Sequence, residues 1–176
     1  MINEVYEYTI DKKKEGGYKL ARTLMVVFYF AFFIGLFALV LYTKLYPTFA
    51  IAPILLWILI LATWRFVSIE YKYTVESGVI TLITVYGSKT RRVKNSFKIK
   101  EFSSLLPLDA ASGAIAEFNA DKTYNLLSSD KTPKDAYAVM TVKDGKRFVA
   151  LIEAPTPSLK EILYYATEEV RKGAKP

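Results

Sequence analysis

The chain of 176 residues contains no cysteine and no histidine. Without cysteine it cannot form a disulfide, a thiolate zinc site or a cysteine nucleophile. Without histidine it lacks the imidazole base of catalytic triads and the side chain that most readily titrates near neutral pH. Any chemistry therefore depends on Asp, Glu, Lys, Tyr and Ser, and we expect no metal ligands.

The sequence also lacks an enzyme motif. Its carboxylates are scattered, whereas general acid–base catalysis needs them in pairs, so a hydrolase is the weakest interpretation. The segment Gly87–Thr90 reads GSKT, like part of a phosphate-binding loop. It lacks the upstream glycine and the strand-to-helix context of such a loop. We expect no catalytic residue and no cofactor.

Apolar and charged residues are both abundant. Hydrophobic residues make up 52% of the chain, aromatic residues 15% and charged residues 23%. This mixture is typical of a membrane part joined to a water-soluble part. The net charge of +7 fits either nucleic acid or the anionic face of a membrane as a partner.

Two long runs carry no charge, Thr23–Thr43 and Leu45–Trp64, with Lys44 between them. Each is close to the ~20 residues that a helix needs to cross a bilayer. We therefore predict an antiparallel transmembrane hairpin over residues 23–66. The alternative is a pair of buried helices in a soluble protein, but a chain this short could not cover two such helices.

Side chains within and around the runs support a membrane hairpin. Tyr42 and Tyr46 mark the tip, and Trp64 and Phe66 mark the far end, as aromatic residues do at a membrane interface. Pro53 falls inside the second run, where a neighbouring helix can tolerate it. Ala31 and Gly35 are small residues four positions apart, a spacing that could let the two helices approach each other closely.

The flanking cations lie mainly before the first run and after the second, at the end of the hairpin opposite its tip. The positive-inside tendency therefore predicts that both termini are cytoplasmic and that the protein resides in the cell membrane. Residues 1–22 would be a cytoplasmic N-terminal segment. A cleavable signal peptide is excluded because the first run is too long and a second follows at once. The flanking cations are Lys12, Lys13, Lys14, Lys19 and Arg22 before the first run, and Arg65 and Lys72 after the second.

Beyond Phe66 the pattern changes to short strands and turns. Alternating or continuous apolar residues predict strands over residues 69–76, 79–86, 136–142 and 147–154. Ser77-Gly78, Gly87-Ser88 and Asp144-Gly145 predict the turns between strands. Residues 121–129 permit another strand, and residues 108–120 a loop or a short helix.

The last segment predicts one amphipathic helix. Thr156 or Ser158 would cap its start, and Gly173 would end it. Ser158 and Glu161 have the spacing of a capping box. The helix would pack on the sheet, or alternatively bind a partner. Its apolar stripe consists of Leu159, Ile162, Leu163, Ala166 and Val170.

These patterns together predict a membrane α-hairpin followed by an α+β soluble domain, residues 67–176, with a bent antiparallel sheet or barrel capped by the C-terminal helix. The segments EYKYTVESGVITL, KTRRVKNSFKIKEFSSLLPL and GKRFVALIEAPTPSLKEILYYA resemble bacterial membrane-anchored proteins with a pleckstrin-homology-like (PH-like) domain. The chain is most similar to a Gram-positive, clostridial-type family of two-helix membrane proteins. That family carries no established activity, so the resemblance implies the fold and assigns no functional residue.

The stretch YGSKTRRVKNSFKIKE, Tyr86–Glu101, is strongly basic. Read as a strand, it places Arg92, Lys94, Lys98 and Lys100 on one face. Val93, Phe97 and Ile99 would point to a core on the other. The cationic face could protect a sheet edge, contact anionic lipid headgroups or bind a protein partner. Nucleic acid is not expected, because exposed aromatic residues do not alternate with the cations.

The predicted function is a non-enzymatic scaffold or adaptor at the inner face of the membrane. It would be integral, with two spans, and its partners would be anionic lipid headgroups or a membrane protein. The alternative is an accessory subunit of a membrane transporter or enzyme complex, assembled through the helix hairpin.

Overall fold

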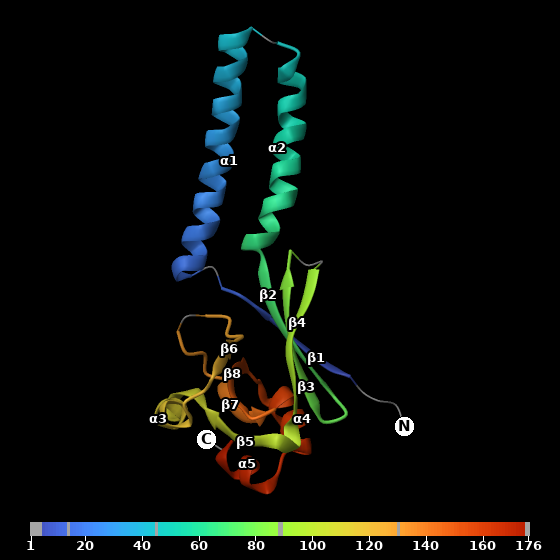
Figure 1. Ribbon diagram of the computed structural model, residues 1–176, viewed down its shortest axis with the longest axis vertical. Coiled ribbons are helices and arrows are strands. Elements are labelled where there is room, and N and C mark those ends of the chain that lie inside the picture. The colour runs from blue at the N-terminus through green and yellow to red at the C-terminus, as the bar shows by residue number, and fades with distance from the viewer. Residues whose placement is uncertain (1–4, 14, 45, 88–89, 130, 175–176) are drawn as a thin grey trace. The chain divides into compact units, whose positions relative to one another are not determined.

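A computed structural model of the chain (Figure 1) describes residues 5–13, 15–44, 46–87, 90–129 and 131–174. The predictions that involve Lys14, Leu45 and the turn at Ser88, and with it the GSKT segment, lie partly outside these residues. The chain separates into two compact units. The helical unit consists of Lys14–Ile69 and Tyr86–Thr90. The sheet unit consists of Met1–Lys13, Glu70–Val85 and Arg91–Pro176.

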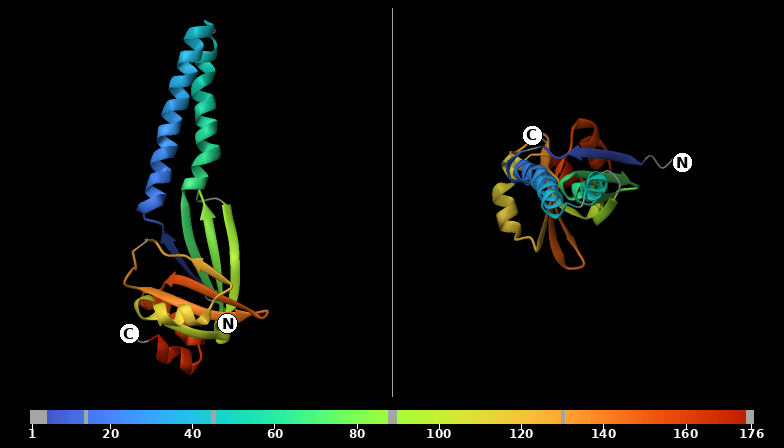
Figure 2. Two further views of the ribbon diagram at one scale, coloured as in Figure 1. Left: turned by 60° about the vertical axis from the view of Figure 1, so that its left-hand side comes forward. Right: turned by 90° about the horizontal axis from the view of Figure 1, so that it is seen from above.

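The helical unit contains the two predicted helices, α1 (Gly16–Thr43) and α2 (Thr48–Trp64), which lie side by side (Figure 2). A short 3-10 turn, η1 (Arg65–Val67), follows α2. Tyr29 and Thr63 share a hydrogen bond of 2.6 Å between their hydroxyl groups. The rings of Phe37 and Phe49 meet edge to face with centroids 5.1 Å apart. These contacts hold the hairpin together.

Most of the surface of both helices is uncovered. In the most apolar part of each helix, 11% of the residues are buried within the structure. Such exposure does not fit the helices of a soluble core, which bury their apolar side chains. The chain thus has two helices long and apolar enough to cross a membrane.

The small residues of α1 take no part in the hairpin contact. Ala31 and Gly35 are both exposed, and a Cβ atom added at Gly35 would meet nothing within 4 Å. The prediction that this pair brings the two helices together is therefore wrong for the hairpin. The second helix, α2, continues through Pro53, whose side chain is exposed.

The sheet unit holds two four-stranded sheets, ordered β1-β2-β3-β4 and β5-β7-β8-β6. The first consists of β1 (Tyr6–Asp11), β2 (Ile69–Glu76), β3 (Val79–Tyr86) and β4 (Thr90–Lys98). The second consists of β5 (Phe102–Pro107), β6 (Lys122–Asn125), β7 (Ala136–Lys143) and β8 (Lys146–Glu153). Its helices are α3 (Leu108–Phe118), α4 (Thr156–Tyr165) and α5 (Glu168–Gly173), with a 3-10 turn, η2 (Ile99–Glu101).

This arrangement corrects the prediction of one bent sheet or closed barrel. The sheets are separate, and β6 pairs in parallel with β8, so the second sheet is mixed. Side chains from both sheets and from α4 and α5 form a common core. Its members include Ile10, Tyr73, Leu82, Phe97, Leu105, Val139, Ile152 and Ile162. Within residues 108–120 the structure has a helix, α3, which was one of the two predicted alternatives.

Two hairpin turns confirm the turn predictions made from local chemistry. Ser77 and Gly78 have φ angles of 50° and 77°, and Asp144 and Gly145 have φ angles of 52° and 74°. Positive φ at both central residues is the geometry that matches the twist of the flanking strands in a two-residue hairpin. Glycine and aspartate reach this conformation at low cost, which is why the sequence signal was reliable here.

No pattern in the sequence indicated strands β1 and β5. β1 lies in the N-terminal segment that the sequence set apart from the sheet, and it pairs antiparallel with β2, from Tyr6 opposite Val75 to Asp11 opposite Glu70. The rings of Tyr8 and Tyr73 lie 5.5 Å apart across this pair. The helical hairpin is therefore inserted, in sequence, between two neighbouring strands of one sheet.

The C-terminal segment forms two helices where one was predicted. The chain becomes extended at Ala166, between α4 and α5. The Arg171 guanidinium donates hydrogen bonds to the carbonyl oxygens of Leu163 at 2.7 Å and Tyr164 at 2.8 Å, which satisfies the end of α4. The predicted stripe is nevertheless in the core, because Ile162, Ala166 and Val170 are buried there.

Ser158 does not cap the helix as predicted. Pro155 occupies the N-cap position, and α4 begins at Thr156. The Ser158 side chain is buried and shares a hydrogen bond of 2.9 Å with the Tyr6 hydroxyl. A local capping signal was thus replaced by a contact with β1, a strand that the sequence did not reveal.

Candidate functional site

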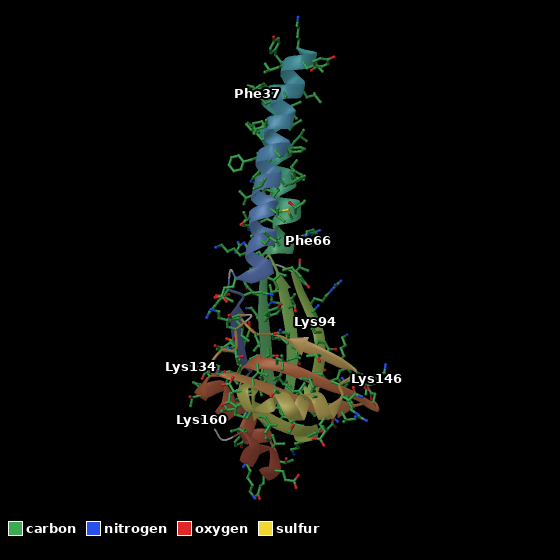
Figure 3. All side chains as sticks on the ribbon, turned by 90° about the vertical axis from the view of Figure 1, so that its left-hand side faces the viewer. Phe37, Phe66, Lys94, Lys134, Lys146 and Lys160 are labelled. Carbon is green, nitrogen blue, oxygen red and sulfur yellow. The ribbon has the colours of Figure 1, made fainter. Side chains whose placement is uncertain are left out.

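The basic residues singled out by the sequence lie on and beside an edge strand. β4 forms one edge of its sheet, and Arg92, Lys94 and Lys98 are exposed along it. Lys100 is also exposed but lies in the turn η2, beyond the strand. Figure 3 shows the side chains of this region, with Lys94 labelled. The predicted cationic face therefore exists for three of the four residues, and the fourth is displaced from it.

The predicted apolar face is only partly correct. Phe97 and Ile99 are buried, at 2% and 0% exposure, whereas Val93 is 62% exposed. Every residue from Thr90 to Lys94 is exposed, including Arg91. The first half of β4 thus presents both of its faces to the surroundings, and Arg91 joins the cations that the sequence had assigned to one face.

The second half of β4 is held by the opposite sheet. Phe97 packs with its ring centroid 5.5 Å from that of Phe148. The Lys143 ammonium group donates to the Asn95 side-chain oxygen at 3.2 Å and to the Ser96 carbonyl at 2.9 Å. These contacts explain why the predicted alternation holds from Asn95 onward and is absent before it.

Lys98 differs from the cations at the start of the strand. Its ammonium group lies 3.1 Å from a carboxylate oxygen of Glu101 in an exposed ion pair. Such a pair contributes about 0–1 kcal/mol to stability. It nevertheless places a negative charge beside Lys98, which weakens the attraction of this end of β4 for an anion.

Gly87, which follows β3, packs against the segment that follows α2. The Gly87 amide donates a hydrogen bond of 2.8 Å to the Ser68 carbonyl. Gly87 has a φ of 60°, and a Cβ atom added there would lie 2.9 Å from the Cβ atom of Arg65. Only glycine allows so close an approach at this backbone angle. Tyr86, Gly87 and Thr90 accordingly belong to the helical unit.

The basic half of β4 begins where the helical unit stops. Thr90 is the last residue of that unit, and Arg91 is the next residue along the chain. At ~3.3 Å per strand residue, the Cα atoms of Arg92 and Lys94 can lie no more than about 7 and 13 Å from that of Thr90. The limit for Lys98 is about 26 Å. Chain connectivity alone therefore keeps Arg91, Arg92 and Lys94 near the end of α2.

Aromatic and cationic side chains gather at the same end of the helix pair. The Tyr18 hydroxyl donates to the Val67 carbonyl at 2.7 Å and accepts from the Ile69 amide at 3.1 Å. The Arg22 guanidinium lies over the Trp64 ring, 5.0 Å from its centroid. The sequence had marked Trp64 as an interface residue, but nothing in it pointed to Tyr18.

A cavity of about 310 Å³ opens at this end of α2. Its walls come from the last turns of α2 with Arg65, and from residues on either side of the turn between β3 and β4. The lining residues are Ile60, Leu61, Trp64, Arg65, Tyr86, Gly87 and Thr90. Sequence reasoning missed this cavity, because only tertiary structure brings its two walls together.

A second, more open cavity of about 390 Å³ involves α3, β7 and β8. Arg147 lines it, but this side chain donates a hydrogen bond of 3.0 Å to the carbonyl of Phe118, the last residue of α3, and so caps that helix. Among the described residues, no group of three or more carboxylate, histidine or cysteine side chains could hold a metal ion.

Two pKa shifts in the sheet unit have clear structural causes. The Lys72 ammonium group donates to a Glu7 carboxylate oxygen at 2.9 Å, and this hydrogen bond lowers the pKa of Glu7. Burial raises the pKa of the Tyr73 phenol, whose hydroxyl donates to the Glu153 carbonyl at 2.9 Å. Both groups link strands of the sheet unit, and neither lines the cavity at α2.

Comparison with known proteins agrees with the architecture. A family model described as "Bacterial PH-like domain (DUF6106)" matches residues 3–172. The matched region contains both apolar helices and both sheets. Neither a curated protein nor a solved structure matches the chain.

Proposed function

Because this chain belongs to the bacterial PH-like domain family, we propose that it is a membrane-anchored, non-enzymatic scaffold or adaptor at the inner face of the cell membrane. In this proposal α1 and α2 span the bilayer, and both termini lie in the cytoplasm. The sheet unit is then held at the membrane surface, where it meets anionic lipid headgroups or a partner protein.

The uncovered apolar surface of the helix pair carries the proposal. At ~1.5 Å per residue, the 28 residues of α1 extend about 42 Å, more than the ~30 Å of a hydrocarbon core. The apolar segment Phe49–Val67, with 19 residues, extends about 28 Å. In water such a surface would favour aggregation, whereas in a bilayer it is solvated by lipid tails.

The distribution of charge supports the orientation. Arg22 and Arg65 lie at the end of the helices that joins the sheet unit, whereas Lys44 is the cation of the tip. Further lysines precede α1, among them Lys12 and Lys13. Cations are retained on the cytoplasmic side during insertion, which favours a cytoplasmic sheet unit.

The start of β4 is the part of the sheet unit that we propose meets anionic lipid. Arg91, Arg92 and Lys94 are exposed and follow directly on the helical unit. Each cation near an anionic surface contributes about 1 kcal/mol, and the effect decays over a Debye length of about 8 Å. Lys98, beside Glu101, and Lys100, beyond the strand, contribute less.

The absence of native cysteine makes the topology directly testable. Single cysteines are placed at the tip (Lys44→Cys) and near the C-terminus (Lys172→Cys), both at exposed positions. In intact cells a membrane-impermeant maleimide should label the first variant and not the second, and lysis should expose both. Labelling of Lys172→Cys in intact cells would refute the orientation. Release of the protein by alkaline carbonate would refute integral insertion.

One observation favours the alternative, an accessory subunit of a membrane transporter or enzyme complex. Ala31 and Gly35 form a small-residue face on α1 that the hairpin leaves open. Such a face permits close approach of another helix. Co-purification with a larger membrane protein in mild detergent, lost in Gly35→Leu but retained in Leu41→Ala on another face of the same helix, would support this function. A protein that purifies without a partner would count against it.

A further inference from the structure

We propose that the cavity at the end of α2 binds one anionic phospholipid, with its phosphate at Arg65 and the start of its acyl chains against Ile60 and Leu61. This inference rests on the proposed insertion of α1 and α2 in a membrane. It goes beyond a general attraction to an anionic surface, because it assigns a defined cavity to a single lipid molecule.

The polarity of the lining changes along α2 and into η1 in the order that a lipid requires. Ile60 and Leu61 supply the apolar part, and Trp64 and Arg65 follow one helical turn later. At ~1.5 Å per residue, Leu61 and Arg65 are about 6 Å apart along the helix axis. A lipid changes from hydrocarbon to phosphate over a similar depth at the membrane interface, where Trp side chains also concentrate.

The opposite wall supplies hydrogen-bonding groups. Tyr86, at the end of β3, and Thr90, at the start of β4, line the cavity, and both side chains carry a hydroxyl. A hydroxyl can donate to a phosphate oxygen or accept from a headgroup hydroxyl. The lining residues therefore include apolar side chains, one cation and two residues that carry a hydroxyl, a composition that suits a headgroup better than a wholly apolar ligand.

The charge of the site favours an anion. Arg65 is the only charged residue among the described residues that line the cavity. Its guanidinium lies over the Phe66 ring, 4.9 Å from the centroid, and its Cβ atom packs against Gly87. A guanidinium can bind a phosphate through two parallel hydrogen bonds. Arg91 and Arg92, which follow Thr90 directly, increase the positive potential nearby.

The size of the cavity limits what it can hold. At about 310 Å³ it is at the small end of the range for ligand sites, ~300–1,000 Å³. A complete phospholipid is larger, so the cavity would enclose the headgroup region while the acyl chains continue along the exposed apolar surface of α2. The exposed side chains of Leu61 and Ile58 provide that surface.

The experiment uses the full-length chain in a neutral detergent and native mass spectrometry to count bound lipids. Phosphatidylglycerol and phosphatidylcholine are titrated in parallel. We expect one phosphatidylglycerol to remain bound at concentrations where phosphatidylcholine does not. Arg65→Gln should weaken this binding about tenfold or more, because it removes the charged partner of the phosphate. Equal binding of the two lipids would overturn the proposal.

Two further variants separate a site from a general charge effect. Lys19→Gln removes an exposed cation at the same end of the helix pair without touching the cavity lining. It should leave binding within about twofold, and a loss equal to that of Arg65→Gln would overturn the site. Leu61→Trp keeps every charge but fills the apolar part of the cavity, and it should also release the lipid. Retention by this variant would likewise overturn the site.

A third comparison identifies the source of the phosphate. Inorganic phosphate is added at millimolar concentration to the complex with phosphatidylglycerol. Retention of the lipid supports a lipid site, whereas its displacement would assign the cavity to a free anion and overturn the proposal. Resistance of the wild-type protein to carbonate extraction from membranes reports insertion separately. Loss of lipid binding with insertion intact therefore refutes the lipid site and leaves the proposed function standing.

Discussion

The hydroxyl of Tyr18 and the carbonyl oxygen of Val67 are joined by a hydrogen bond of 2.7 Å, across 49 residues of chain. The same hydroxyl accepts a hydrogen bond from the Ile69 amide. Tyr18 lies in the first turns of α1, and Val67 ends the 3-10 turn that follows α2. One phenol thus holds the start of the helix pair to the segment that leads into β2.

Removing this phenol should loosen the end of the helix pair. Tyr18→Phe keeps the ring but leaves the Val67 carbonyl and the Ile69 amide without this partner, which should cost about 1–3 kcal/mol of stability. Thermal unfolding in detergent should show a lower midpoint for this variant. Tyr42→Phe is the control, because Tyr42 is 91% exposed at the tip. Equal midpoints for the two variants would show that the bonds of Tyr18 contribute little.

The two hairpin turns provide a matched pair of glycines. Gly78 and Gly145 occupy the same position of equivalent turns, with φ angles of 77° and 74°. Alanine should cost about 1–2 kcal/mol at either site, because a side chain is unfavourable at positive φ. At Gly78 the added Cβ atom would also lie 3.2 Å from the Tyr165 ring, whereas at Gly145 it would meet nothing within 4 Å.

Gly78→Ala should therefore destabilise the protein more than Gly145→Ala. The difference between the two variants isolates the contact with α4 from the backbone cost. Urea unfolding, followed by far-ultraviolet circular dichroism in detergent, measures both free energies. Identical losses would indicate that Tyr165 moves aside without cost.

The ion pair between Glu7 and Lys72 should make the stability of the protein depend on pH. The hydrogen bond that Lys72 donates lowers the pKa of Glu7 below the ordinary value of 4.5, so the native state favours the ionised carboxylate. The contribution is therefore fully present above that value and is lost as pH falls through the lower pKa of the folded protein. Because the pair is partly exposed, it should be worth no more than about 1 kcal/mol.

The variant Glu7→Gln should be less stable than the wild type at pH 7, and the difference should vanish at strongly acidic pH. Urea unfolding at a series of pH values measures it. Glu76→Gln, at an exposed position near the end of β2, is the control and should show a smaller difference at neutral pH. A difference for Glu7→Gln that persists unchanged at low pH would mean that the charge is not what stabilises the pair.

The proposed lipid contact of β4 can be followed at Val93, which lies between Arg92 and Lys94 and is 62% exposed. A neutral maleimide should label Val93→Cys more slowly in nanodiscs of anionic lipid than in nanodiscs of neutral lipid. Salt should restore the rate, because screening weakens contacts between exposed charges. Val142→Cys, on β7, controls for a general effect of the lipid on the reagent.

The assignment to particular cations is tested in the same assay. Substituting Arg92 and Lys94 with glutamine should abolish the slowing, whereas substituting Lys98 and Lys100 should leave most of it. The reason is that the latter pair lies further along the chain from the helical unit and Lys98 has Glu101 beside it. Equal labelling rates in the two kinds of nanodisc would refute a lipid contact at β4.

Features with a local physical cause could be predicted from the sequence. The apolar runs specified both helices, and Ser77-Gly78 and Asp144-Gly145 specified two hairpins through their positive φ angles. Features that arise from pairing of distant segments could not. β1 is short and lies among charges, and only its partner β2 reveals it as a strand. The break at Ala166 likewise depends on the core that buries it.

The candidate site divides in the same way. The exposure of Arg92, Lys94 and Lys98 follows from alternation along a strand, a local property. Val93 departs from that alternation because only the second half of β4 is covered by the opposite sheet, which includes Phe148. The cavity beside Arg65 forms only where residues at the end of β3 and the start of β4 meet the end of α2, and no local pattern in the sequence marks it.

The position of β1 constrains how the protein is made. β1 leaves the ribosome before α1 and α2, but its partner β2 follows them, so the first sheet cannot assemble until the hairpin has been synthesised. Until then β1 has no neighbour. A fragment that begins at Ile69 would lack β1 and would expose the edge of β2 to intermolecular pairing. Synthesis of the hairpin must therefore precede folding of the sheet, and the two parts should be expressed as one chain.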